Sequence, residues 1–298
     1  QPAPLIIQPE AVYLITGGLG ALGLHIAQQL VADGARKLVL TGRHGMRNDE
    51  QRTRIEQLTA AGAQLEIVAA DIADAPAVKA LIDHCLALGP LRGIVHAAGL
   101  IDDGVLASQT MTRLEQVMRP KVYGAWHLHT FTQGMALDFL VCFSSGAALT
   151  GSPGQSTYAA ANAFLDALMQ HRQRHGLPGL SINWGAWAEG GMAAHLQKQM
   201  AAQGAPMIPP AQGRALFRYL LAQPCGQVAV FPRPQSSAST SANRRAPQRA
   251  LLRERLANSR SAERQAQLEA ALRSEIAAVL GLPADTVLDA RTRLFDFG

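Results

Sequence analysis

FLVCFSSGAALTGSPGQSTYAAANAFLD, residues 139–166, is the stretch that decides the fold. Its first five residues are apolar, which predicts a short buried strand that ends at Ser144 and Ser145. A loop rich in Gly, Ser and Pro follows, and then an alanine-rich helix that places Tyr158 and Asn162 four residues apart on one face. Because ligands bind at the carboxyl ends of strands in a parallel sheet, these polar side chains predict a catalytic site. The alternative is a core helix preceded by serines that cap the loop.

A glycine-rich turn lies near the start of the chain. The apolar run 12–16 predicts a first strand, and TGGLGALG (residues 16–23) leads from it into a helix over 22–32. Glycines at this spacing permit a tight turn and let the backbone approach a pyrophosphate at a helix N-terminus. The next predicted strand, 37–41, is followed by Arg43, whereas an NAD-binding unit has Asp or Glu there. We therefore expect NADPH as the cofactor, with Arg43 beside its 2′-phosphate.

Strands and helices continue to alternate up to residue 231. The patterns predict helices over 52–61, 75–88, 112–131 and 210–222, and strands over 64–69, 93–96, 179–183 and 227–231. This alternation predicts an α/β fold with a doubly wound, Rossmann-type parallel sheet. The expected cofactor-binding residues are the glycine turn and the residues that follow the strands: Thr16, Gly17, Gly18, Leu19, Gly20, Gly23, Arg43, Asp71, Ile72, Ala97, Ala98 and Gly99.

Composition and charge argue against several other classes of protein. No apolar run approaches the ~20 residues that span a bilayer, and we expect no secretory leader. The three cysteines are far apart and suggest neither a disulfide framework nor a metal site, which fits a cytoplasmic setting. The net charge of +5 is concentrated in the arginine-rich segment 233–265. That segment also contains a low-complexity run, so we expect a solvated linker there rather than a nucleic-acid-binding arm.

Several motifs together resemble the ketoreductase domain of type I modular polyketide synthases, a branch of the short-chain dehydrogenases/reductases. They are TGGLGALG, HAAG (96–99), Lys121, FSS (143–145), GSPGQSTYAAANAFLDAL (151–168) and LSINWGAW (180–187). The resemblance covers roughly residues 11–232 and implies that NADPH reduces a β-keto thioester. Most short-chain dehydrogenases carry a lysine four residues after the tyrosine, where this chain has Asn162. The resemblance assigns the role of that lysine to Lys121.

The resemblance also implies what each polar residue of the site does. Tyr158 donates a proton to the ketone oxygen, Ser145 donates a second hydrogen bond to it, and Asn162 positions the lysine or a relay water. A free tyrosine has a pKa near 10, so we expect the Lys121 cation, within about 4–6 Å, to lower the pKa of Tyr158. The alternatives are that Lys121 is a surface residue and Asn162 a helix-face amide.

Product stereochemistry is implied by the residues that follow HAAG. They read LIDDG, which resembles the Leu-Asp-Asp signature of B-type ketoreductases, with Ile101 in the place of the leucine. A-type enzymes tend to carry a tryptophan eight residues before the tyrosine, where this chain has Thr150. The resemblance therefore implies a B-type enzyme with a D-configured product, in which Asp102 and Asp103 control stereochemistry. A simple polar turn is the alternative.

Other residues are assigned to the substrate side of the site. Trp184 and Trp187 are either core anchors or a wall for the acyl chain. Met192 begins an apolar run that continues to Met200, and a lid helix over the substrate is one interpretation of it.

The chain is expected to comprise four segments: a linker over 1–10, the ketoreductase domain over 11–232, a flexible basic linker over 233–262 and a last segment over 263–298. The last segment has a helical pattern over 268–280 and resembles the start of an acyl carrier protein, cut before its phosphopantetheine serine. The opening PEAVYLITGG resembles ketoreductases that follow an enoylreductase. The expected partners are a carrier protein bearing a β-ketoacyl phosphopantetheine and neighbouring synthase domains. Alternatives are a free-standing dehydrogenase for small alcohols and a scaffold domain without activity.

Overall fold

The computed structural model describes residues 6–188, 206–232, 256, 259 and 261–280. The chain divides into two compact units: Gln1–Gln197 with Met207–Pro232, and Lys198–Pro206 with Arg233–Gly298. The first unit holds the sheet and the helices that cover it. Within the described part of the second unit lies one long helix, α11 (Ser261–Leu280).

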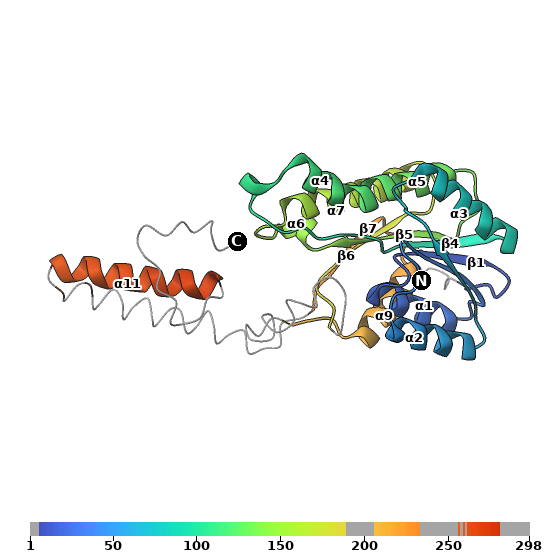
Figure 1. The fold of residues 1–298 in the computed structure, drawn as a ribbon, viewed down its shortest axis with the longest axis horizontal. Helices are drawn as coiled ribbons and strands as arrows, with labels where there is room; N and C mark the ends of the chain where they lie inside the picture. Colours follow the sequence, from blue (N-terminus) through green and yellow to red (C-terminus); the bar gives the residue numbers. More distant parts are fainter. Residues whose placement is uncertain (1–5, 189–205, 233–255, 257–258, 260, 281–298) are drawn as a thin grey trace. The chain divides into compact units, whose positions relative to one another are not determined.

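Seven parallel strands form one sheet in the order β3-β2-β1-β4-β5-β6-β7 (Figure 1). The strands are β1 (Val12–Thr16), β2 (Lys37–Gly42), β3 (Gln64–Ala69), β4 (Leu91–His96), β5 (Phe139–Ser145), β6 (Leu180–Trp184) and β7 (Gln227–Val230). The order runs in opposite directions on either side of the β1/β4 pair, and ligands bind at such a switch point, outside the carboxyl ends of the strands. The predicted α/β fold with a doubly wound parallel sheet is confirmed.

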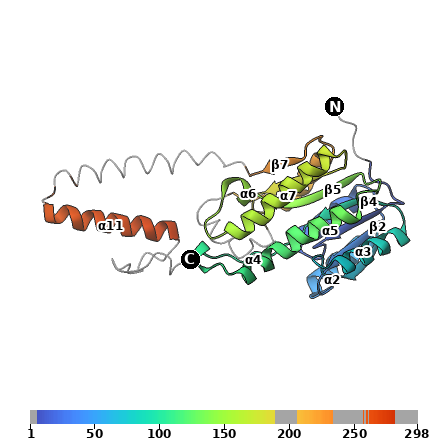
Figure 2. The same ribbon diagram turned by 90° about the horizontal axis from the view of Figure 1, so that it is seen from above.

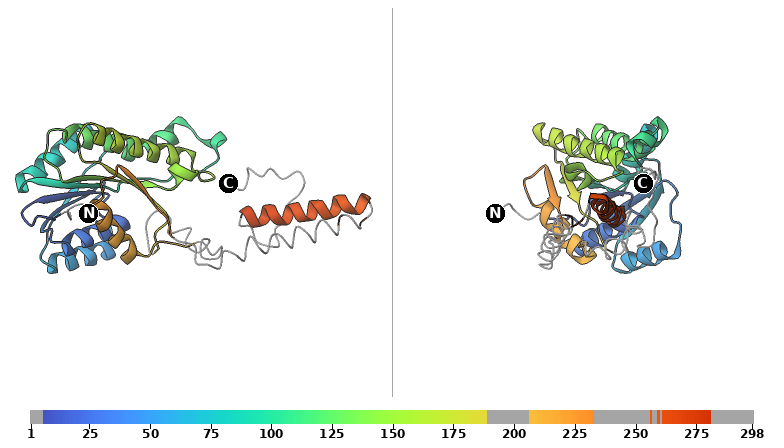
Figure 3. Two further views of the ribbon diagram at one scale, coloured as in Figure 1. Left: turned by 180° about the vertical axis from the view of Figure 1, so that it is seen from behind. Right: turned by 90° about the vertical axis from the view of Figure 1, so that its left-hand side faces the viewer.

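Helices cover both faces of the sheet. One face carries α1 (Ala21–Ala32), α2 (Asp49–Ala60) and α9 (Pro210–Leu221). The other carries α3 (Ala75–Leu88), α4 (Met111–Met118), α5 (Gly124–Phe131) and α7 (Ser156–Arg174). Figure 2 looks onto the second face, and Figure 3 shows the layers from behind and from one end. Each helix buries an apolar stripe against the strands, which is what binds the three layers together.

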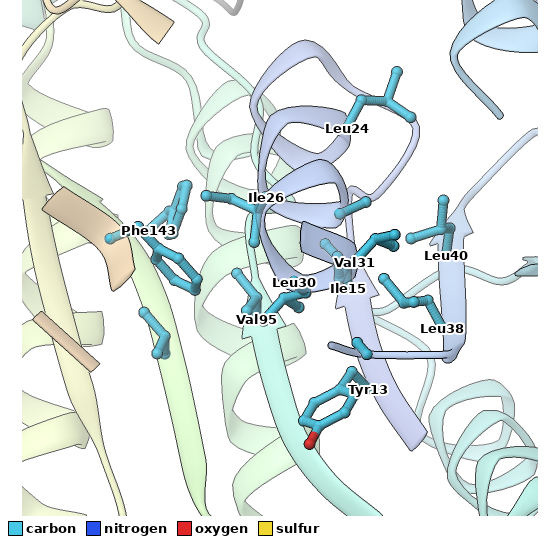
Figure 4. Packing of buried hydrophobic residues seen from close by; sticks show 14 of the residues in the cluster. Tyr13, Ile15, Leu24, Ile26, Leu30, Val31, Leu38, Leu40, Val95 and Phe143 are labelled. Atoms are coloured by element: carbon cyan, nitrogen blue, oxygen red, sulfur yellow. The ribbon is translucent and has the colours of Figure 1, made fainter. Parts of the chain in front are cut away.

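The first strand shows why the core is continuous on both sides of the sheet. Tyr13 and Ile15 are fully buried in the cluster beneath α1 and α9, which Figure 4 shows. Val12 and Leu14 are fully buried in the cluster beneath α3, α5 and α7. A strand covered on both faces has no polar side, so a continuous apolar run rather than an alternating one is expected.

The long helix expected over 112–131 is interrupted. α4 ends at Met118, and α5 begins at Gly124. Between them lies a π-helical turn, η2 (Arg119–Tyr123). Pro120 has no N–H with which to continue the regular hydrogen bonding, which accounts for the break. Single π-helical turns are frequent at functional sites, and this one carries Lys121.

The central stretch also differs in detail from its predicted form. β5 includes both serines, since Ser144 pairs with Asn183 and Ser145 with Trp184 on β6. Trp184 therefore ends β6, one residue beyond the strand predicted over 179–183. The short helix α6 (Ala147–Thr150) lies in the segment predicted to be a loop, and the short helix η1 (Leu106–Ser108) lies in a segment for which no element was predicted.

Some expectations fall on residues that the structure does not describe. The lid over Met192–Met200 lies outside the described residues, as does most of the linker 233–262. The helix expected over 268–280 is part of α11, which begins earlier, at Ser261. The loop after it lies outside the described residues.

Candidate active site and cofactor cleft

The glycine turn between β1 and α1 allows close contact between backbone segments. Gly17 has φ +66°, and a Cβ there would lie 2.7 Å from the backbone nitrogen of Ala98. A Cβ on Gly23 would overlap the carbonyl oxygen of Gly17. The turn therefore requires glycine at both positions, and α1 begins directly at the sheet edge. The free N–H groups of its first turn favour an anion at this point.

A cleft of about 610 Å³ opens at the carboxyl ends of β1, β2 and β4. Its lining contains ten of the predicted cofactor residues: Thr16, Gly17, Gly20, Gly23, Arg43, Asp71, Ile72, Ala97, Ala98 and Gly99. The other two, Gly18 and Leu19, are buried and do not line it. The remaining lining residues are ones that the sequence reasoning missed: Ala21, Leu22, Thr41, Gly42, Ala70, Leu100, Gln116, Arg119 and Pro120.

Arg43, Asp71 and Arg119 give the cleft its charge. Arg119 Nη2 donates a hydrogen bond to Asp71 Oδ2 at 3.2 Å. Burial raises the pKa of Asp71, but a hydrogen bond from Ala73 N and the two arginines outweigh it, so the net shift is downward. Asp71 stays ionised, which leaves two cations and one anion at this end of the cleft. Arg119 was missed because, from the sequence alone, it is one of many arginines.

Lys121 is buried in the π-helical turn, with 2% of its surface exposed. Its Nζ donates a hydrogen bond to Phe143 O at 2.9 Å and lies 5.4 Å from the centre of the Tyr158 ring. Burial lowers the pKa of Lys121 to about 8, and the nearby Cys142 and Asp166 oppose this shift. The surface-residue alternative for Lys121 is wrong.

Tyr158 lies near the start of α7 and is 8% exposed. Burial raises its pKa above 10, hydrogen bonds from the side chains of Asn162 and Ser145 oppose this, and the charge of Asp103 adds to it. The expectation that Lys121 brings about a net lowering is wrong, because removing the phenolate from water has the larger effect. Tyr158 is therefore protonated at neutral pH and able to donate.

Asn162 and Ser145 complete the group around Tyr158. Asn162 is fully buried, and its Nδ2 donates to Tyr158 O at 2.7 Å. Its Oδ1 accepts no hydrogen bond from any described residue, which leaves an acceptor for a water or an ammonium group. Ser145 Oγ accepts a hydrogen bond from Ala147 N at 3.2 Å, and the same hydroxyl lies within hydrogen-bonding reach of Tyr158.

The loop with Asp102 and Asp103 is held from two sides. Arg113 of α4 donates two hydrogen bonds to the Asp102 carboxylate, at 2.5 and 2.7 Å, and one to Asp103 O at 2.8 Å. These bonds lower the pKa of Asp102. Gln155, just before α7, donates to the Asp103 carboxylate at 3.1 Å. Arg113 and Gln155 were missed because only the folded chain brings them to this loop.

The two tryptophans assigned to the substrate side lie in the core. Trp184 and Trp187 are 5% and 3% exposed, with ring centres 5.0 Å apart in an edge-to-face arrangement. They pack with Phe143 and Phe217 in the cluster beneath α1 and α9. This placement favours the core-anchor alternative. Met192 lies outside the described residues.

Among the described residues no group of three or more His, Cys, Asp or Glu side chains is arranged to hold a metal ion. None of the helices described is sufficiently long and apolar to traverse a membrane.

Comparison with known proteins identifies the family. The family model described as the KR domain matches residues 11–189. The spectinabilin polyketide synthase system protein NorB of Streptomyces orinoci is 39% identical, over 97% of this chain and 14% of its own length. The phenolphthiocerol synthesis polyketide synthase type I Pks15/1 of Mycobacterium marinum is 38% identical, over 97% of this chain and 15% of its own length. The chain thus spans about a seventh of these two relatives.

Solved structures agree with this assignment. A structure of A-type ketoreductases from a modular polyketide synthase superimposes with a TM-score of 0.72 and 36% identity, covering 77% of this chain and 50% of that one. A structure of an A1-type ketoreductase gives a TM-score of 0.72 and 35% identity, covering 78% and 50%. The fold, the glycine cleft and these matches lead to one conclusion: the chain belongs to the KR family, the ketoreductase domains of polyketide synthases.

Proposed function

We propose that this domain reduces the β-keto group of a polyketide thioester, carried by an acyl carrier protein, to a β-hydroxyl at the expense of NADPH. The observation that carries the proposal is the grouping of Lys121, Tyr158, Ser145 and Asn162 at the end of β5. Lys121 directly follows Pro120, which lines the cleft with the glycine turn. A proton donor, a cation and a hydroxyl thus lie beside a cleft suited to a dinucleotide.

The cleft fits NADPH in its shape and chemistry. The glycine turn and the small residues after β4 leave space at the backbone, and the first turn of α1 suits a pyrophosphate. Arg43 suits a 2′-phosphate because of its charge and its position after β2. KR domains typically depend on NADPH, and the cofactor, when bound, supplies the hydride for the β-carbon.

The residues of this chain stabilise the negative charge that forms on the ketone oxygen. Tyr158, which is protonated at neutral pH, donates a proton to that oxygen. Ser145 donates a second hydrogen bond, so the oxygen is stabilised as its negative charge grows. The Lys121 cation stabilises the phenolate left on Tyr158, and the open Asn162 acceptor holds a relay water through which the proton is replaced.

A prediction for the cofactor follows from the position of Arg43. A charge-assisted contact with the 2′-phosphate is worth about 1.5–3 kcal/mol, so Arg43→Ala is expected to weaken NADPH binding about tenfold or more. The affinity for NADH is expected to stay nearly constant, because NADH has no 2′-phosphate. Fluorescence titration of both cofactors measures this, with Arg47→Ala, an exposed arginine on the loop that follows, as the control. Equal losses for NADPH and NADH would place Arg43 away from the phosphate.

The carrier protein and the neighbouring synthase domains are the proposed partners. The relatives are many times longer than this chain, which supports a place within a multidomain synthase. We assign the ketoreductase to residues 11–232, between a linker over 1–10 and a basic linker over 233–262, and the start of a carrier domain to 263–298. A free-standing dehydrogenase and an inactive scaffold are the competing functions.

The test of the function is NADPH oxidation with a series of β-ketoacyl thioesters. A ketoreductase oxidises NADPH with thioesters in preference to simple ketones. A free-standing dehydrogenase prefers small alcohols or ketones, and a scaffold turns over neither. NADPH binding measured by fluorescence without substrate separates the scaffold further, since a scaffold need not bind the cofactor.

Product configuration is a second prediction. We assign the domain to the B type, with a D-configured hydroxyl, because of Asp102, Asp103 and Thr150; the two solved structures compared above are of A-type and A1-type enzymes. Arg113 and Gln155 hold the aspartates in place. Arg113→Ala removes the hydrogen bonds to Asp102 and to Asp103 O, so it is expected to lower the ratio of D to L product a few-fold. Chiral chromatography of a reduced diketide thioester measures the ratio. A predominantly L product from the unmodified chain would refute the B-type assignment and leave ketoreduction standing.

A further inference from the structure

Two polar side chains lie inside the otherwise apolar strand β6. Ser181 and Asn183 are fully buried. They are two residues apart along the strand, so both side chains point to the same face of the sheet. Their neighbours on β5 are Cys142 and Ser144, by the register of the two strands. Buried polar groups require partners, so this face must contain something that binds both side chains.

Asp166 of α7 is that partner, and it is 6% exposed. Its Oδ1 accepts a hydrogen bond from Ser181 Oγ at 2.5 Å, and its Oδ2 accepts one from Asn183 Nδ2 at 2.8 Å. Asp166 follows Tyr158 by eight residues and Asn162 by four, so all three lie along one stripe of α7. The carboxylate thus fixes the face of α7 that carries the proposed proton donor.

Hydrogen bonds connect Asp166, Ser181 and Asn183 to the candidate active site. Asn183 Nδ2 also lies 2.9 Å from Ser144 Oγ, and Ser144 Oγ donates to Asn162 O at 3.3 Å. Asn162 in turn donates to Tyr158 O, as described above. On the other side, Gln227 of β7 donates to Asn183 Oδ1 at 3.0 Å. The connection therefore runs from the sheet through α7 to the backbone of Tyr158.

Asp166 also differs in charge from the other groups near Lys121. These groups are Cys142 on β5, Tyr158 on α7 and His96 on β4. Burial raises the pKa of Cys142 to about 12 and lowers that of His96 to about 3, and the pKa of Tyr158 is raised. All three are neutral between pH 6 and 9. The carboxylate of Asp166 is the anion in this set.

We propose that Asp166 is a positioning residue for the reduction: it fixes the Tyr158 face of α7 through Asn183 and Ser144, and its charge favours the protonated form of the buried Lys121. The role in catalysis rests on the proposed function, whereas the charge coupling to Lys121 does not.

The coupling is tested by unfolding, without any substrate. Lys121→Met is made in three backgrounds: the unmodified chain, Asp166→Asn and Asp138→Asn. Asp138 is the control, because it pairs with Arg92 at the opposite ends of the strands. For each background, urea unfolding from pH 6 to 10.5 gives the difference in stability between the chain that keeps the lysine and the chain with Lys121→Met. This difference isolates the titration of Lys121.

In the unmodified chain this stability difference is expected to stay constant below pH 8 and to shrink above it, because the folded lysine then loses its proton. In the Asp166→Asn background the shrinkage is expected to begin about one pH unit lower, the smallest shift typical of losing a nearby opposite charge. The Asp138→Asn background is expected to match the unmodified chain. Shrinkage at the same pH in all three backgrounds would overturn the proposal.

The positioning role of Asp166 in catalysis is tested by the pH dependence of kcat for a β-ketoacyl thioester. Asp166→Asn is expected to lower kcat about tenfold at pH 8 and to move the alkaline limb to lower pH, with KM changed less than about twofold. Ser181→Ala removes one hydrogen bond to Asp166 but keeps the charge of the carboxylate. It is therefore expected to lower kcat a few-fold without moving the alkaline limb of the pH profile. Ser181→Ala also tests the positioning role if Asp166→Asn does not fold. An unmodified chain that reduces no thioester refutes the proposed function; an active chain that these substitutions leave unaltered refutes this inference.

Discussion

Tyr158→Phe is expected to lower kcat for thioester reduction by about 10²–10⁴-fold, the range typical for loss of a general acid. The substitution removes the phenolic hydroxyl and keeps the ring, whose burial contributes to the small cluster with Val117, Ala147 and Ala161. Stability is therefore expected to change by no more than about 1 kcal/mol, the usual contribution of a hydrogen bond. NADPH oxidation and thermal unfolding measure the two effects.

The matched control is Tyr219→Phe on α9, where the side chain is exposed and far from the candidate site in the sequence. It is expected to leave both activity and stability unchanged. NADPH binding should persist in Tyr158→Phe, because the tyrosine does not line the cofactor cleft. If Tyr158→Phe keeps nearly full activity, another group donates the proton, and the role assigned to Tyr158 is wrong.

The fold was predictable because its signals are local. Apolar runs such as residues 12–16 and 139–143 are long enough for strands and too short for helices, and glycines mark the turn after β1. The spacing of Tyr158 and Asn162 also suffices to place them on one helix face. Residue Lys121 is different: nothing local distinguishes it from a surface lysine, and only the resemblance to a family indicated its role.

What the sequence did not predict depends on tertiary structure. The π-helical turn at Pro120 and the pairing of Ser144 and Ser145 with β6 require the sheet to be assembled. The pKa of Tyr158 was predicted with the wrong sign, because the extent of burial cannot be read from the residue and its charged partner alone. Arg119 was missed for a similar reason: its importance comes from Asp71, which is distant in the sequence.

Lys121→Met is expected to change activity and stability in opposite directions. Burial lowers the pKa of Lys121 from 10.5 to about 8, so the folded chain holds this proton less tightly than the unfolded chain. The charged lysine therefore destabilises the fold fully below pH 8, and the penalty disappears as the pH rises toward 10.5. A shift of this size corresponds to about 3 kcal/mol, and leaving Phe143 O without its donor costs about 1 kcal/mol. At pH 7 the variant is thus expected to be more stable by roughly 2 kcal/mol.

Activity is expected to fall despite this gain. Methionine fills the space of the lysine but cannot stabilise a phenolate on Tyr158, so kcat is expected to drop by about 10²–10³-fold, as when an electrostatic stabiliser is removed. Urea unfolding at pH 7 and pH 10 measures the stability, and the gain should be smaller at pH 10, where the unmodified lysine is already mostly neutral in the folded chain. Lys79→Met on α3, where the lysine pairs with Asp83 at the surface, is the control and is expected to alter neither property appreciably. If Lys121→Met lowers stability and activity together, Lys121 supports the fold rather than the chemistry. A more stable and nearly inactive variant is the result that a buried cation retained for catalysis predicts.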